Sequence, residues 1–419
     1  MNKKNNPLLV AFITIFLDLL GFGILIPIQP FFAESLGASA STVTLLSAVY
    51  SVMQFLFAPL WGGLSDRYGR RPIILSSIFI SSVGYFIFAS AQSLLWLFVA
   101  RAISGFGNAN LGAAQAIIAD STSGADRAKG MGLIGAAFGL GFIFGPAFGG
   151  FLGQFSPRTP LYAAAFLAVF NLILAFFILP ETVKKNPASS QKSMGGLRSL
   201  AIAQKYDNVI PILLISLIAT TAFTQLEQII SLYIDRIWVA DSLVGDARIK
   251  VSAKKTALFL IVIGIFAAII QGGLIGTLTK RFGEIKLILS GILILALSLF
   301  LIPWIGMTGH FTLLLCFAPF IAAGSSILSP SRSSLLSRSL PDDIQGSVLG
   351  IHQSAASLGR IIGPASAGFL FEIQREIPFY AGAILMILAA PIALYLTPPS
   401  TETKPTEKNR IKESSSSTL

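Results

Sequence analysis

Between two long apolar runs the chain carries a short charged turn, Gly62-Gly63-Leu64-Ser65-Asp66-Arg67-Tyr68-Gly69-Arg70-Arg71-Pro72. Gly69 can take the backbone conformation that ends a helix, and Pro72 suits the first turn of the next helix. The flanking runs are therefore predicted to be neighbouring helices joined by a tight turn. A degraded copy follows later between two further apolar runs, Gly276-Thr277-Leu278-Thr279-Lys280-Arg281-Phe282-Gly283. This repetition predicts a chain of two related halves.

The composition is that of a membrane protein. Of the 419 residues, 54% are hydrophobic and 12% are charged, and the mean hydropathy of +0.77 exceeds what a water-soluble domain tolerates. The net charge of +11 comes from cations in the connections between apolar runs. Positive-inside topology explains that distribution better than a basic face for nucleic acid, so we expect no nucleic-acid partner. With the single cysteine Cys316, an internal disulfide is impossible.

Twelve apolar runs are long enough to cross a bilayer as helices. Their approximate limits are 8–33, 42–64, 73–90, 94–119, 128–154, 160–179, 209–233, 255–278, 286–306, 310–335, 346–371 and 377–397. We interpret the first run as a retained span because it is longer than the apolar core of a signal peptide and contains Asp18. The expected fold class is an all-α polytopic membrane protein with twelve transmembrane helices in two pseudo-symmetric six-helix bundles.

Lys and Arg gather in every second connection, which places both termini on the cytoplasmic side. The connection 235–255 is an exception because it mixes both signs of charge. We expect an N-terminal bundle (1–179), a cytoplasmic linker rich in Lys, Ser and Gly (180–208), a C-terminal bundle (209–397) and a disordered cytoplasmic tail (398–419).

The repeat is clearest in the fifth and eleventh spans, where the stretch 141–152 matches the stretch 359–370. Glycines every four residues in the fifth span predict a ridge without side chains, along which another helix can approach closely. The expected helix contacts involve Gly141, Gly145, Pro146, Gly149, Gly150, Gly363 and Pro364. Parallel duplication with a binding site where the halves meet is a recurrent transporter architecture.

Two charged residues of the first half, Asp18 and Arg101, fall deep inside predicted spans. A charge in hydrocarbon costs several kcal/mol on most estimates, so each needs a partner, a wet cavity or an interface. Asp18 lies roughly 15 Å into the first span, near the midplane. It is interpreted as a proton-accepting carboxylate, with a fixed structural ion pair as the alternative. Arg101, about 10 Å from the outer end of the fourth span, is its expected counter-charge or else a structural arginine bonded to backbone carbonyls.

The second half has two further candidates. Glu227 lies towards the outer end of the seventh span, either as a second proton or substrate carboxylate or as a side chain that snorkels to the interface. Arg360, within the eleventh span, is expected to face the cavity or to pair with an acid. The other candidate cavity residues are Phe22, Gln54, Asn108, Asn110, Gln115, Gln225, Gln353 and His352, although polar residues in spans also bond one helix to another. We expect no metal and no cofactor.

These features resemble the major facilitator superfamily, and more narrowly its twelve-span drug:proton antiporters. The stretch 62–72 fits that superfamily's cytoplasmic loop motif, and Arg101 with Gly105 and Gly107 resembles its fourth-span motif. The stretch 135–153, with Gly145-Pro146 at its centre, resembles the fifth-span motif of exporters. The resemblance covers nearly all of the first half and is weaker in the second.

Within that group the sequence is most similar to the tetracycline-resistance efflux proteins. The matching stretches are Leu17-Asp18…Gly21…Pro27, Phe57-Ala58-Pro59 and Ile118-Ala119-Asp120. Members that export tetracycline carry an acidic residue in the third span, where this chain has Gly84. This departure argues against tetracycline itself as the substrate, so the resemblance implies multidrug or tetracycline-like efflux.

The resemblance also implies a conformational latch at the charged turn. Asp66 is expected to bond the positive end of the eleventh span, near Ser347, while Arg70 pairs with Asp120. These links would hold the halves together on the inside and break when the cavity opens inward. A topology signal without a switching role is the alternative. The expected latch residues are Gly62, Asp66, Arg67, Gly69, Arg70, Arg71 and Asp120.

The function predicted from these residues is a proton-coupled antiporter that exports small lipophilic or cationic compounds. The alternative is a symporter or facilitator that imports sugars or other metabolites on the same fold. A primary pump is disfavoured because the chain has no Gly-x-x-x-x-Gly-Lys-Ser/Thr loop, and an enzyme because two His and one Cys give no metal cluster or evident nucleophile. The expected setting is a bacterial inner membrane, as a monomer whose partners are a small-molecule substrate, protons and membrane lipid.

Overall fold

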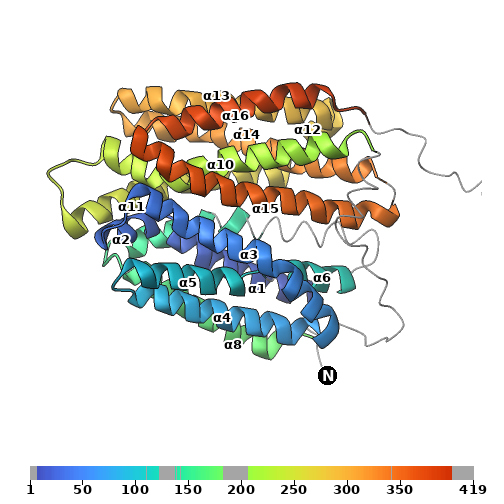
Figure 1. Cartoon of the computed structure of the whole chain (residues 1–419), viewed down its shortest axis with the longest axis horizontal. Coiled ribbons are helices and arrows are strands. Elements are labelled where there is room, and N and C mark those ends of the chain that lie inside the picture. Colours follow the sequence, from blue (N-terminus) through green and yellow to red (C-terminus); the bar gives the residue numbers. More distant parts are fainter. Residues whose placement is uncertain are drawn as a thin grey trace, which may run out of the picture.

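The computed structural model describes residues 7–109, 111–121, 137, 139–141, 143–182, 206–340 and 342–398. The regular elements in these ranges are helices that run lengthwise through the molecule in two groups (Figure 1). The first group comprises α1 (Pro7–Leu25), α2 (Gln29–Ser35), α3 (Ala40–Tyr68), α4 (Arg70–Ser90), α5 (Leu94–Gly107), α6 (Leu111–Ser121), the segment Gly139–Leu152 and α8 (Thr159–Ile178). The second comprises α10 (Val209–Trp238), α11 (Gly245–Ile269), η1 (Ile270–Leu274), α12 (Ile275–Phe282), α13 (Glu284–Met307), α14 (Phe311–Arg338), α15 (Asp342–Ile373) and α16 (Ile377–Leu394).

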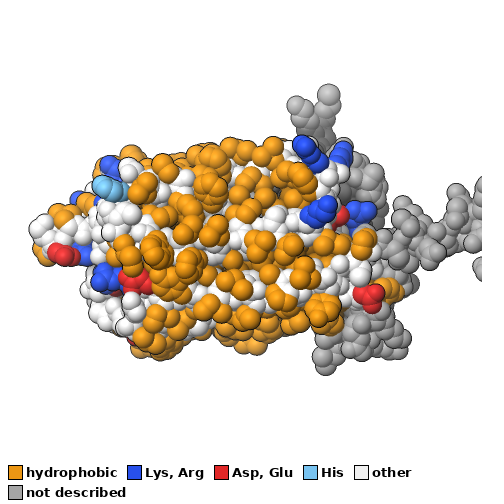
Figure 2. Space-filling view, turned by 90° about the horizontal axis from the view of Figure 1, so that it is seen from above, with side chains coloured by type: hydrophobic (Ala, Val, Ile, Leu, Met, Phe, Trp, Pro, Cys, Tyr) orange, Lys and Arg blue, Asp and Glu red, His pale blue; other side chains and the backbone are white. Residues whose placement is uncertain are grey.

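Nine of the helical stretches in the described ranges are long and apolar enough to cross a membrane. The prediction of an all-helical polytopic membrane protein is therefore confirmed. Of the other three predicted spans, the fourth is divided between α5 and α6, the eleventh is the 32-residue helix α15, and the fifth is described only from residue 137 onward. On the face shown in Figure 2, hydrophobic side chains cover the length of the molecule and charged ones gather at its two ends. This distribution matches a belt of lipid around the middle.

The two ends differ in what they carry. We call the end with the charged turn, with residues 182 and 206 and with the last described residues the linker end. The opposite end, with α2 and the connection before α11, is the distal end (Figure 1). The predicted linker (180–208) and tail (398–419) fall almost wholly outside the described residues.

The repeated turn forms the same structure in both halves. Gly69 follows α3 with a positive φ of 107°, and Gly283 follows α12 with a φ of 76°. Positive φ favours glycine because it has no Cβ. In the first half the Glu181 carboxylate also accepts hydrogen bonds from the backbone N–H groups of Arg70 (3.0 Å) and Arg71 (3.2 Å). The first turn of α4 is thereby fixed to the chain that follows α8.

The first predicted span is not one helix. The helix α1 ends at Leu25, and α2 begins at Gln29 after a turn that contains Pro27. Proline lacks an N–H donor and disfavours helical conformation in the residue before it, so a break at this point is expected physically. The short helix α2 lies at the distal end and contacts α10 and α11 of the second half.

Equivalent glycines in the two halves make equivalent contacts. A Cβ on Gly145 would lie 2.6 Å from the Gly23 Cα of α1, and one on Gly363 would meet Thr224 of α10 at Oγ1. Further along each helix, Gly150 faces Ala257 of α11, and a Cβ on Gly368 would lie 2.5 Å from the Ser41 Cα of α3. Each of these helices therefore contacts the first helix of its own half and a helix of the other half.

Candidate functional site

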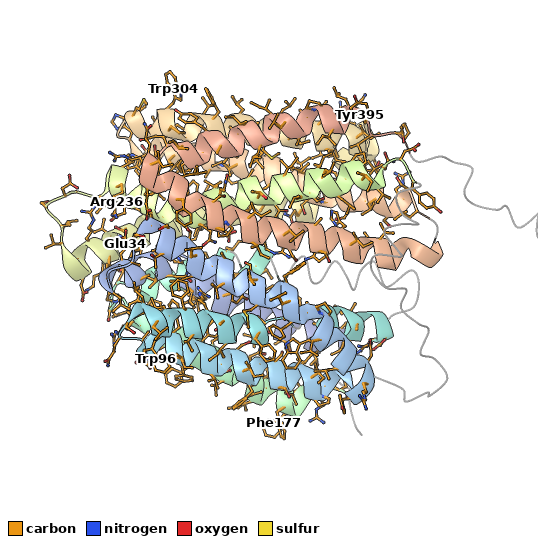
Figure 3. The ribbon with its side chains drawn as sticks, viewed as in Figure 1. Glu34, Trp96, Phe177, Arg236, Trp304 and Tyr395 are labelled. Carbon is orange, nitrogen blue, oxygen red and sulfur yellow. The ribbon has the colours of Figure 1, made fainter. Side chains whose placement is uncertain are left out.

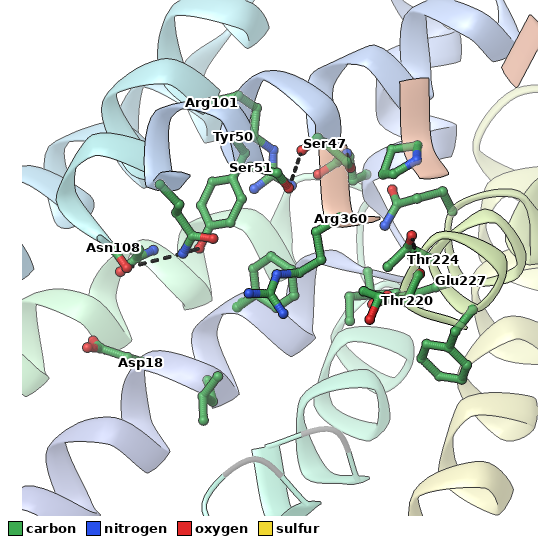
Figure 4. Close-up of a pocket in the computed structure, with 18 of the residues that line it drawn as sticks. Asp18, Ser47, Tyr50, Ser51, Arg101, Asn108, Thr220, Thr224, Glu227 and Arg360 are labelled. Carbon is green, nitrogen blue, oxygen red and sulfur yellow. Dashed lines mark hydrogen bonds between the residues drawn. The ribbon is translucent and has the colours of Figure 1, made fainter. Parts of the chain in front are cut away.

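A cavity of about 330 Å³ lies between the two halves (Figure 4). Its walls come mainly from α1 and α3 of the first half and from α10 and α15 of the second. The charged lining residues are Asp18, Arg101, Glu227 and Arg360, and the aromatic ones are Phe22, Tyr50 and Phe223. Phe22 stacks on Tyr50 with ring centroids 5.5 Å apart. The cavity thus combines both signs of charge with flat apolar surfaces.

Asp18 is held by a residue that the sequence analysis missed. Its Oδ1 accepts a hydrogen bond of 2.8 Å from Nδ2 of Asn171, which also donates to the Thr14 carbonyl at 3.1 Å. Asn171 is fully buried on the otherwise apolar helix α8. A lone amide in an apolar span is a signal in the sequence, because polar groups in a membrane need partners there.

Arg101 does not lie against Asp18 as expected. Its side chain is only 3% exposed, and its guanidinium carbon lies 4.9 Å from the ring centroid of Phe88 and 5.5 Å from that of Tyr50. Figure 4 draws Arg101 well apart from Asp18, with Tyr50 and Asn108 between them. The charge of Arg101 is therefore stabilised by aromatic faces.

Asn108 joins three helices at one wall of the cavity. It follows the end of α5, so the predicted fourth span is interrupted there. Its side chain accepts a hydrogen bond from Ser81 Oγ (2.9 Å) and donates to the Tyr85 hydroxyl (3.3 Å). Its backbone carbonyl accepts from Gln54 Nε2 at 3.1 Å. Asn108 and Gln54 therefore line the cavity and also bond one helix to another.

Gly84 lies where helices α4 and α5 touch. A Cβ at this position would lie 2.3 Å from Ser104 Oγ and 3.1 Å from the Ala100 carbonyl oxygen. Only glycine fits this approach without a shift of the helices. An acidic side chain, which the resemblance to the tetracycline exporters would place here, has no room at this position.

The second half contributes a different pair of charges. Glu227 on α10 lines the cavity, so it does not snorkel to an interface, and Arg360 on α15 reaches into the middle of the cavity (Figure 4). Arg360 Nη2 donates to Ser357 Oγ at 2.9 Å. Gln353 also lines the cavity. Gln225 does not: it is 3% exposed and donates to Ser366 Oγ at 2.8 Å, which bonds α10 to α15.

Three further candidates have other positions. His352 Nε2 lies 2.7 Å from Ser216 Oγ and is not part of the cavity lining. Asn110 and the side chain of Gln115 lie outside what the structure describes. Within the described residues there is no group of three His, Cys, Asp or Glu side chains that could hold a metal ion.

At the linker end, Arg70 pairs with Asp120 as expected and also with Asp66, but both carboxylates belong to its own half, so these contacts do not join the two halves. Nη1 contacts Asp66 Oδ1 at 2.5 Å, and Nε contacts Asp120 Oδ2 at 3.2 Å. The Asp66 side chain remains 69% exposed. The expected partner of Asp66, near Ser347, has side chains outside the described set. Arg67 lies over the ring of Tyr68, at 5.2 Å from its centroid.

Polar contacts between the halves gather at the distal end. Arg236 Nη2 lies 2.5 Å from Glu34 Oε1, and Figure 3 shows these two side chains meeting between the halves. The Ser41 N–H donates to Glu372 Oε1 at 2.8 Å. Burial raises the pKa of Glu34 above its ordinary value, and the neighbouring Arg236 opposes that shift. The distal end is therefore closed in this structure.

A buried carboxylate supports this closure. Asp235, on the last turn of α10, is 1% exposed and accepts hydrogen bonds from Arg236, Arg248 and Ser252. The sequence signalled this cluster only by the mixed charges of 235–255. A buried carboxylate with several charge-assisted hydrogen bonds fixes the geometry of the arginine that reaches Glu34.

Comparison with known proteins identifies the class. The sequence model of the Major Facilitator Superfamily matches residues 11–364 and 251–418, and the chain belongs to this superfamily of membrane transporters. It is 32% identical over 401 residues to the "Tetracycline resistance protein, class C" of Escherichia coli, a match that covers 93% of this chain and 96% of that protein. It is 28% identical to "Multidrug resistance protein 1" of Bacillus subtilis (strain 168), covering 96% and 98% of the two chains. The crystal structure of the human organic anion transporter MFSD10 (TETRAN) shares the fold, with a TM-score of 0.69, 24% identity and coverage of 94% and 100%.

Proposed function

We propose that the chain is a proton-coupled antiporter that exports small lipophilic or cationic compounds. The observation that carries the proposal is the cavity between the halves, whose lining joins carboxylates to aromatic rings. Apolar and aromatic walls bind flat lipophilic compounds, and a carboxylate at membrane depth is a site for a proton or a cation. The names of the relatives, which are resistance proteins, support export as the direction.

Asp18 is the proposed proton acceptor. Its described partner, Asn171, is a neutral donor at 2.8 Å. An amide N–H can bond an ionised carboxylate and also the carbonyl oxygen of a protonated one, so this contact tolerates both states. Protonation removes a charge from the cavity and changes the relative free energies of its two conformations. Proton and substrate then shift the equilibrium between the inward-facing and outward-facing states in opposite directions, which is the requirement for antiport.

Glu227 and Arg360 are proposed to orient the substrate from the second half. Both line the cavity, on facing helices α10 and α15. The amides of Gln54, Asn108 and Gln353 add hydrogen-bonding groups around them. A few polar groups in a mostly apolar lining fix the orientation of a ligand while the apolar surface supplies its contact area.

We propose that, during alternating access, one end of the cavity opens while the other end closes. Closure at the distal end by Glu34 and Arg236 corresponds to a state that faces the linker end. The Lys and Arg residues of the sequence favour the linker end as cytoplasmic, so this state is inward-facing. In it Asp66 is paired within its own half and largely exposed. The latch to α15 is then proposed to form only when the distal end opens.

The proposal is tested with the full chain in proteoliposomes under an imposed pH gradient, with ethidium as substrate. Asp18→Asn should abolish gradient-driven ethidium accumulation while leaving ethidium exchange without a gradient measurable. The matched control is Asp241→Asn, because Asp241 is fully exposed at the distal end and should leave accumulation unchanged. Retained accumulation in Asp18→Asn would refute the assignment. Direction is tested in cells, where loss of the protein should raise ethidium content.

A further inference from the structure

A groove of about 670 Å³ lies on the outside of the first half, between the start of α4 and the end of α8. Its lining includes Leu75, Ser76 and Phe79 of α4 and Ile173, Phe176 and Phe177 of α8. Phe177 is 76% exposed, and Figure 3 shows it at the outer edge of the molecule, away from the second half. In a bilayer this surface meets acyl chains.

Arg71 lies at the linker end of the groove. Its Nη2 donates to the Phe176 carbonyl oxygen at 2.6 Å, and its guanidinium carbon lies 5.7 Å from the Phe176 ring centroid. That carbonyl belongs to the last turn of α8, where backbone acceptors lack partners within the helix. Part of the role of Arg71 is therefore to stabilise a helix end. One such bond uses only one of the five N–H donors of a guanidinium.

Arg71 differs from its neighbour Arg70 in that its guanidinium has no carboxylate partner among the described residues. Arg70 engages the carboxylates of Asp66 and Asp120. The ion pairs within the described residues include none for Arg71, and its Nε is shielded from water without an acceptor there. A phosphate in the groove would therefore meet the donors of the terminal nitrogens, Nη1 and the second hydrogen of Nη2, and not the shielded Nε. The groove therefore ends at a cation with free hydrogen-bonding capacity.

We propose that this groove binds one phospholipid with an anionic headgroup, its phosphate at Arg71 and an acyl chain between α4 and α8. The apolar walls alone select no lipid, because acyl chains are equally well solvated elsewhere in the bilayer. Selection comes from the guanidinium, whose planar donors match phosphate oxygens, at the depth where α4 begins and α8 ends. A zwitterionic lipid carries its own ammonium group, which offsets the attraction of its phosphate to Arg71, so an anionic headgroup is favoured.

The test uses the full chain in nanodiscs with Phe177→Trp as a fluorescent reporter in the groove. Brominated phosphatidylglycerol should quench the added emission more than brominated phosphatidylcholine at equal mole fraction. Emission from the four native tryptophans is subtracted with the parent protein. Arg71→Gln on this background should weaken the preference for phosphatidylglycerol about fivefold, the effect of one cation near the headgroups. Arg71→Lys, which keeps the charge, should retain most of the preference for phosphatidylglycerol.

Arg67→Gln is the matched control, since it removes the same charge from the same turn and Arg67 contacts Tyr68 rather than the groove. It should leave the preference unchanged. Equal quenching by the two lipids in the reporter protein, or an equal loss in Arg67→Gln and Arg71→Gln, would overturn the proposal. If Arg71→Gln is not monodisperse, Ser76→Phe fills the groove instead. Unchanged quenching by phosphatidylglycerol in that variant would also contradict the site.

Discussion

The two halves make equivalent helix contacts but carry their cavity carboxylates at different depths. Gly145 meets Gly23 of α1, and the equivalent Gly363 meets Thr224 of α10. On α1, Asp18 lies towards the linker end from the contact at Gly23. On α10, Glu227 lies towards the distal end from the contact at Thr224. At 1.5 Å per residue the two carboxylates are about 12 Å apart along the helix direction. Duplication therefore explains the scaffold, whereas the charges are specific to each half.

The arginines of the two halves differ in the same way. Arg101 is buried over the rings of Phe88 and Tyr50, while Arg360 reaches into the cavity from α15. The first arginine is part of the wall that supports Asn108 and Tyr50. The second is available to a ligand. A substitution in each half should therefore have a different kind of effect.

The largest expected effect separates these two arginines. Arg101→Gln removes two desolvated cation–π contacts, worth about 2 kcal/mol each, and should lower the free energy of unfolding by about 2 to 4 kcal/mol. Arg360→Gln should change stability little and should strengthen ethidium binding, because it removes a positive charge that repels this cation in the cavity. Thermal unfolding and ethidium titration of the purified variants measure both. Equal loss of stability in the two variants would show that the arginines have the same role.

A smaller effect is expected at the two contacts between the halves. A Cβ on Gly368 meets the backbone of Ser41, whereas one on Gly150 meets only the Ala257 methyl at close range. Overpacking costs about 1 to 3 kcal/mol, and here it is paid only while the distal end is closed. Gly368→Ala should therefore open the distal end more than Gly150→Ala, measured as the distance distribution between spin labels on α2 and α11.

Ala257→Gly should reverse the effect of Gly150→Ala and leave that of Gly368→Ala unchanged. If both glycine variants respond to Ala257→Gly, or neither changes the distances, the contacts do not hold the distal end closed.

The smallest effect concerns pH at the distal end. The pKa of Glu34 is raised above 4.5 in the closed state, mainly by burial. Because the Glu34 carboxyl group binds its proton more tightly in the closed state, protonation favours that state. The closed population should therefore rise as pH falls through the range just above 4.5. The same spin-label distances measure it. Glu34→Gln should remove the dependence, and opening on acidification would contradict the sign.

Much of the fold was predictable because its signals are local. Hydropathy gave the long helices, and Gly69 and Gly283 marked the turns between them. The matched glycines of the fifth and eleventh spans predicted contacts that the structure contains at Gly145 and Gly363. The break at Pro27 was legible as well, yet the length of the apolar run outweighed it in the prediction.

The arrangement of the site was less predictable because it depends on which helix faces meet. Asp18, Glu227 and Arg360 were identified from their cost in a membrane, and they line one cavity. Asn171, which donates a hydrogen bond to Asp18, lies more than 150 positions later in the chain. Arg101 was expected either to pair with Asp18 or to bond backbone carbonyls, but aromatic faces can also stabilise a buried cation, and spacing along the chain does not distinguish these roles. The Glu34 and Arg236 contact joins segments whose proximity no local pattern encodes.

The most direct test of the account is to measure protons released when the purified protein binds ethidium, in weakly buffered solution with a pH indicator. If Asp18 is the coupling acid, the unaltered chain should release protons on binding, and Asp18→Asn should release none while still binding ethidium. Asp241→Asn should behave as the unaltered chain. Proton release of the same size from Asp18→Asn would contradict the account, because the proton would then come from another group.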